Sequence, residues 1–103
     1  MENLSVKTKE KLKEQTITLI DGSFNPSDAA DIINAVLDVK INFHKLKRIS
    51  IMEGNTNDLC EYDTERIHEL IKTKENIKEY FKDARLKGKK LNVDGIINIS
   101  IKN

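Results

Sequence analysis

Three side chains in this sequence have the chemistry for nucleophilic or acid–base catalysis: Cys60, His44 and His68. A thiol beside an imidazole can act as a nucleophile with its base. Cys60 and His68 are separated by a predicted helix start, no local motif surrounds Cys60, and no orienting third group can be named. His44 follows Phe43 and His68 follows Ile67, positions typical of histidines on a helix surface or at an interface. We therefore expect no catalytic residues and no enzymatic activity.

A second group of residues has the chemistry of a cation site. Carboxylates gather between residues 53 and 65, at Glu53, Asp58, Glu61, Asp63 and Glu65. Calcium binds clustered carboxylate and carbonyl oxygens, but this segment lacks the alternating oxygen ligands, central glycine and terminal glutamate of a calcium loop. The single cysteine excludes a multi-cysteine zinc site. We expect a solvated loop, with no metal and no cofactor.

Two lysine-rich clusters are candidates for contact with nucleic acid. The first is Lys40, Lys45, Lys47 and Arg48, and the second is Lys82, Arg85, Lys87, Lys89 and Lys90. Lysine contacts to phosphate give weak, salt-sensitive binding without sequence preference. The chain has 18 basic and 17 acidic residues, for a net charge of +1, which is far from the positive field of a dedicated nucleic-acid binder. Solvated helix faces explain both clusters without a partner.

The length and composition of the chain limit the class of protein to which it can belong. Its 103 residues suit one domain, in which 38% of residues are apolar and 34% charged, a low apolar share for a globular protein. No run approaches the ~18 apolar residues of a membrane span, and the opening residues do not resemble a signal peptide. We expect a cytoplasmic protein that does not contact membranes.

The elements that position these residues follow from the hydrophobic pattern. Residues 1–14 are rich in Lys and Glu and predict a flexible charged tail, followed by one domain over residues 15–103. Residues 15–21 alternate as in a strand, which we expect to end at Asp21-Gly22. Residues 91–102 alternate more regularly still, and Asp94-Gly95 within them is a candidate bulge.

A long helix is predicted from Pro26 to about Ser50. Asn25 suits its N-cap, and Pro26 suits its first position. Two adjacent apolar rows follow it, which make a face wider than a coiled-coil stripe. The first row is Ala29, Ile32, Val36, Val39, Phe43 and Leu46, and the second is Ala30, Ile33, Leu37 and Ile41.

A second helix is predicted to begin with Asp63 or Thr64 as its cap and to end at Gly88. Its apolar row is Ile67, Leu70, Lys74, Ile77, Phe81 and Ala84. Lys74 is the one charge in this row. We expect it either to extend along the hairpin toward solvent or to set the register of the packing.

The order β-α-α-β predicts an α+β fold. Helices joined by a short loop pack antiparallel, and the terminal strands then emerge together and can form an antiparallel pair. A two-stranded ribbon is marginal in water and leaves open edges. We therefore expect homo-oligomerisation, as a dimer or larger. The expected interface residues are Val36, Val39, Phe43, Leu46, Ile97, Ile99 and Ile101.

These observations favour a non-enzymatic assembly or protein-interaction module, acting as a structural or accessory subunit of a larger complex. Its expected partners are copies of itself and another protein. The alternative is a weak, sequence-independent nucleic-acid-associated accessory protein that uses the two lysine clusters.

Two segments of the chain resemble a family of small bacterial proteins of about this length. They are Ile17–Pro26, which contains DGSF-x-P, and Lys40–Leu46, which reads KINFH-x-L. The resemblance covers residues 16–102 and implies Phe24, Phe43 and His44 as recurring side chains. It implies no activity, and residues 53–61 depart most from the family pattern.

Overall fold

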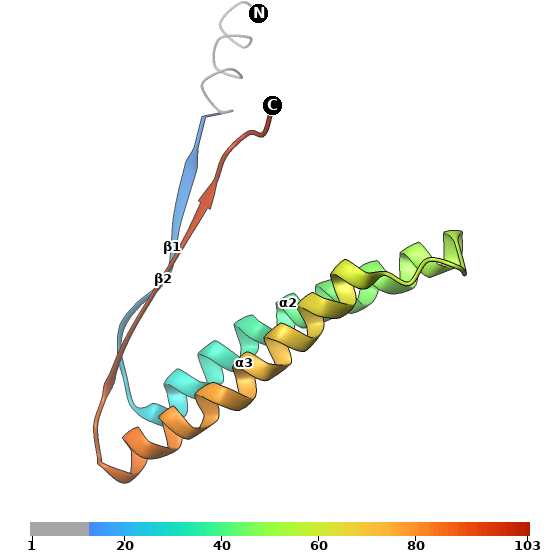
Figure 1. Cartoon of the computed structure of the whole chain (residues 1–103). Coiled ribbons are helices and arrows are strands. Elements are labelled where there is room, and N and C mark those ends of the chain that lie inside the picture. The colour runs from blue at the N-terminus through green and yellow to red at the C-terminus, as the bar shows by residue number, and fades with distance from the viewer. Residues whose placement is uncertain (1–12) are drawn as a thin grey trace, which may run out of the picture. The chain divides into compact units, whose positions relative to one another are not determined.

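The computed structural model describes residues 13–103 and has the element order β-α-α-β. The elements are β1 (Gln15–Phe24), α2 (Pro26–Gly54), α3 (Glu61–Leu86) and β2 (Leu91–Ile99), as Figure 1 shows. The α+β prediction is therefore confirmed. The predicted tail, residues 1–14, falls mostly on residues 1–12, which lie outside the described part of the chain.

The chain divides into two compact units. The helical unit is residues 24–91, and the described part of the strand unit is residues 13–23 and 92–103. Each unit is described by itself below. The prediction of one domain over residues 15–103 stays a prediction.

α2 begins as its sequence predicts. Asn25 has extended backbone angles and its side chain accepts a hydrogen bond from the backbone N–H of Asp28 at 2.8 Å, with Pro26 as the first helical residue. The helix has 29 residues and continues beyond Ser50 to Gly54. There the Asn55 N–H donates to the Ile51 carbonyl at 2.9 Å and closes the last turn.

The predicted start of α3 is wrong by three or four residues. The helix begins at Glu61, and its N-cap is Cys60, which makes no side-chain cap bond and has the left-handed angles φ 50 and ψ 45. The side chain of Asp63 is not a cap because it is buried against α2. Asp63 has the residue type of a helix cap, but its side chain bonds to His44 on α2 instead of capping α3.

The C-terminal end of α3 confirms the predicted glycine stop. Gly88 has φ +64, in the left-handed region that favours glycine. The Gly88 N–H donates to the Arg85 carbonyl at 3.1 Å, and the Lys89 N–H donates to the Ala84 carbonyl at 3.0 Å. This pair of bonds is a Schellman motif, which satisfies carbonyls at the end of the helix.

The two helices form an antiparallel hairpin along which they lie side by side (Figure 1). The apolar side chains buried in it are Ala29, Ile41, Cys60, Ile67, Phe81 and Ala84. Ile41 ends the second apolar row of α2, and the other members of that row are half-buried. That row therefore packs on α3, whereas most of the first row is exposed.

The strand unit is a two-stranded sheet of β1 and β2, with the strands antiparallel as predicted (Figure 1). The Thr16 hydroxyl donates to Asn98 Oδ1 at 3.1 Å across the strands. β1 continues past the predicted stop at Asp21-Gly22 as far as Phe24, because β2 pairs with it along this length. β2 runs unbroken through Gly95, which lies against the side chain of Ile20.

Candidate functional site

The side of α2 that faces away from α3 carries a row of exposed apolar side chains, which we call the α2 stripe: Val36, Val39, Phe43 and Leu46. Their exposed fractions are 42%, 72%, 53% and 67%. An α-helix turns about 100° per residue, so Val39 lies about 200° around the helix from Leu37 in the packed row. The α2 stripe is therefore unpartnered because a helix cannot present both of its apolar rows to one neighbour.

The other predicted interface residues belong to the strand unit. Ile97 and Ile99 are in β2, Ile101 follows it, and their side chains are 43%, 50% and 53% exposed. A ribbon of two strands covers neither of its faces by itself. Each residue predicted to form an interface is thus an exposed apolar side chain, in one unit or the other.

A buried polar pair links the helices near their connecting loop. His44 Nδ1 lies 2.8 Å from Asp63 Oδ1, and the two side chains are 2% and 8% exposed. The geometry assigns the Nδ1 proton to the bond with the carboxylate. His44 Nε2 is buried and has no hydrogen-bond partner among the described residues. A carboxylate beside Nδ1 is the geometry of an oriented general base, but the buried Nε2 is not accessible to a substrate. The hydrogen bond instead links α2 to α3.

The thiol of Cys60, the candidate nucleophile, is not activated. Cys60 is buried, and its thiol lies 3.7 Å from the Arg48 carbonyl oxygen, to which it donates a weak hydrogen bond. Burial raises the pKa of the Cys60 thiol, and the carboxylate of Asp58 raises it further. A raised pKa disfavours the thiolate, which is the reactive form. His68, the third candidate, is exposed on α3.

Lys74, the charge in the apolar row of α3, crosses to the other helix. Its Nζ lies 2.6 Å from Asp38 Oδ1, and the two side chains are 32% and 52% exposed. The contact joins the middle of α2 to the middle of α3, and a role of Lys74 in setting the register stays a prediction. An ion pair this exposed contributes only about 0–1 kcal/mol.

Lys74→Leu is expected to raise the free energy of unfolding by about 1 kcal/mol, because an apolar side chain completes the row and Asp38 is exposed enough to stay hydrated. Urea unfolding followed by circular dichroism measures this gain. The same replacement at the exposed Lys72 is the control and should leave stability nearly unchanged. A Lys74→Leu protein no more stable than the wild type contradicts this assignment.

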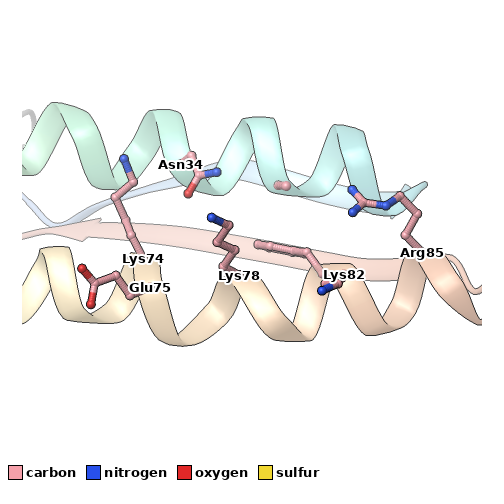
Figure 2. A pocket seen from close by; sticks show the side chains of 8 residues that line it. Asn34, Lys74, Glu75, Lys78, Lys82 and Arg85 are labelled. Carbon is pink, nitrogen blue, oxygen red and sulfur yellow. The ribbon is translucent and has the colours of Figure 1, made fainter.

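A groove with a cavity of about 360 Å³ lies between α2 and α3, away from the connecting loop. Ala30 and Phe81 supply its apolar lining, and Asn34 is its polar residue on α2. The charged lining residues all come from α3: Lys74, Glu75, Lys78, Lys82 and Arg85. Figure 2 shows Lys78 and Arg85 extending from α3 toward α2. The cations repeat every three or four residues, a helical spacing that places them on one face.

The groove was not predicted, because the predicted basic clusters contain residues that are neighbours in the chain rather than neighbours along one face of α3. Lys82 and Arg85 belong to the second predicted cluster, whereas Lys74 and Lys78 belong to neither. Lys78 stands alone in the sequence. The available signal was the helical spacing of Lys74, Lys78 and Lys82, each four residues apart.

The structure does not bring the two predicted nucleic-acid clusters together. Lys40, Lys45, Lys47 and Arg48 lie in the second half of α2, whereas Lys87, Lys89 and Lys90 follow α3, whose end adjoins the start of α2 (Figure 1). Several of these cations already have a protein contact. Lys87 pairs with Asp83 at 3.0 Å, Arg48 donates to the Thr64 hydroxyl at 3.4 Å, and Lys40 lies 4.8 Å from the centre of the Phe43 ring.

Within residues 13–103, no group of three or more His, Cys, Asp or Glu side chains is placed to hold a metal ion. Neither helix of this part of the chain has the length and apolar character needed to cross a membrane. Comparison with known protein families, curated proteins and solved structures finds no match to the chain.

Proposed function

We propose that this protein is a cytoplasmic, non-enzymatic assembly module, which associates with copies of itself and serves as a structural or accessory subunit of a larger complex. The observation that carries the proposal is the α2 stripe, a continuous row of exposed apolar side chains on a helix whose other apolar row is packed. Scattered exposed hydrophobic residues are normal, but a contiguous apolar row is typical of an interaction site.

A second copy of the chain is the occupant that best suits this surface. Each helix of the hairpin has one helical neighbour, and packing two α2 stripes together makes a four-helix arrangement with a shared core. The strand unit also has apolar surface and backbone groups that a second copy can cover, because β1 and β2 each have an open edge and exposed isoleucines. Edge pairing of two ribbons makes a four-stranded sheet.

Leu46→Lys is expected to dissociate this assembly. Leu46 is 67% exposed in the single chain, so a lysine there is tolerated by the fold but places two charges in a symmetric interface. Losing two buried leucines costs about 3 kcal/mol or more, which is at least ~100-fold in the dissociation constant. Sedimentation velocity at micromolar concentration measures the change, and circular dichroism checks that the helices remain.

The matched control is Leu86→Lys, the same replacement at a leucine that is 75% exposed at the end of α3 and outside the α2 stripe. It should sediment as the wild type does. A wild-type protein that sediments as a single chain at all accessible concentrations contradicts the proposed self-association. Equal dissociation of the two variants contradicts the assignment to the α2 stripe.

A further inference from the structure

The groove between α2 and α3 has both an apolar lining and an excess of positive charge. Ala30 and Phe81 give it apolar surface, and its volume of about 360 Å³ lies within the range of ligand pockets. Lys74 is neutralised by Asp38, and Glu75 offsets one further cation. A suitable occupant therefore combines an apolar side chain with carboxylates.

The positive charge of the groove is available to a ligand. Lys78, Lys82 and Arg85 make no ion pair with any residue of the described part of the chain. Figure 2 shows the Lys78 ammonium and the Arg85 guanidinium in the space between the helices. A phosphate backbone would use only the cations of the groove, whereas a peptide with an apolar side chain also contacts its apolar lining, so the groove favours a peptide.

A segment of this chemistry is present in the chain itself, at the loop between α2 and α3. Leu59 is 76% exposed and lies between the carboxylates of Asp58 and Glu61, and Tyr62 beside them is 70% exposed. We call residues 58–62 the acidic tip. An exposed leucine flanked by carboxylates is complementary to an apolar groove flanked by cations.

The acidic tip cannot enter the groove of its own chain. It adjoins the start of α3, whereas Phe81 lies 20 residues further along that helix, which is about 30 Å at 1.5 Å per residue. Any contact between the two must join different copies. The contact also leaves the α2 stripe available, because Ala30 and Asn34 in the groove lie on another side of α2.

We propose that the groove of one copy binds the acidic tip of a second copy, with Leu59 on the apolar lining and Glu61 beside Lys78 and Lys82. This inference rests on the proposed self-association and extends it. The α2 stripe joins chains in pairs, and the contact between tip and groove joins pairs into larger assemblies. In the proposed arrangement each pair places its tips in the grooves of one neighbour and receives the tips of another, a head-to-tail contact that gives rings or filaments.

Charge reversal tests the proposal on the full chain. The groove variant is Lys78→Glu with Lys82→Glu, the tip variant is Glu61→Lys, and all three side chains are exposed. Each variant alone is expected to stop at the dimer, with at least a tenfold weaker association of dimers by light scattering and sedimentation velocity. An equal mixture of the two variants is expected to restore large assemblies, because each reversed surface then meets an opposite charge. Leu59→Ser should also stop at the dimer.

The control is Lys72→Glu with Lys89→Glu, which makes the same change in net charge outside the groove and should assemble like the wild type. A groove variant that forms large assemblies, or a mixture that does not restore them, overturns the proposal. So does a wild-type protein that stops at the dimer, although the α2 stripe assignment then stands. Dissociation of the large assemblies by nuclease shows that the groove holds nucleic acid and also overturns it.

Discussion

Asp63→Ala is expected to lower the free energy of unfolding by about 3 kcal/mol. The replacement leaves the His44 Nδ1–H without its acceptor in a site where Nε2 already has no partner among the described residues. Removing one member of a buried polar pair costs the desolvation of the group that remains. Urea unfolding at fixed protein concentration measures the loss, since the stability of a self-associating protein depends on its concentration.

The matched control is Glu65→Ala, an exposed carboxylate two residues away on the same helix, which should change stability by less than about 0.5 kcal/mol. Asp63→Asn keeps an acceptor oxygen and should lose less than the alanine variant. His44→Leu combined with Asp63→Ala removes both polar partners and should recover much of the loss. Equal losses in the alanine and asparagine variants contradict the hydrogen-bonding role.

Phe81→Ala is expected to cost about 3–5 kcal/mol, because Phe81 is 7% exposed and packs between α2 and α3. Phe43→Ala is the matched comparison. Phe43 is 53% exposed on the α2 stripe, so its replacement should cost the folded chain at most about 1 kcal/mol and should instead weaken self-association. Urea unfolding and sedimentation velocity on both variants separate the two effects.

Comparing the two variants therefore tests whether Phe81 stabilises the single chain while Phe43 stabilises the contact between chains. If Phe43→Ala lowers the unfolding free energy of a monomeric variant as much as Phe81→Ala does, Phe43 is buried in the single chain and the α2 stripe is not free for a partner. If neither variant changes self-association, the interface lies elsewhere. The Leu46→Lys variant supplies the monomeric background for this comparison.

Element order and helix ends were predictable because they depend on local chemistry. Asn25 caps α2 through its own side chain, and Gly88 ends α3 because glycine adopts a positive φ at little cost. The start of α3 was not predictable in the same way. Asp63 has the residue type of a helix cap, but a bond to His44, 19 residues earlier, takes its carboxylate into the hairpin interior.

The candidate site was predictable in part. The 3–4 spacing of the first apolar row of α2 predicted Val36, Val39, Phe43 and Leu46 as one surface, and they are one exposed surface. The spacing alone does not say which of two adjacent rows packs within the chain, because both rows have the period of a helix. The groove could be identified only from the structure, because Ala30 and Phe81, which line it, are 51 residues apart in the sequence.

The sequence by itself determined the α+β class, the element order and the apolar rows of the helices. It also determined the start of α2, which the Asn25 side chain caps, and the end of α3, where Gly88 adopts a positive φ. Only the tertiary structure decided which row is covered, that His44 and Asp63 form a buried pair, and that α3 aligns its cations beside an apolar groove. The reason is the range of the interactions. Capping and periodicity act within a few residues, whereas the choice of a packing face and the burial of a polar group depend on side chains that only folding brings together.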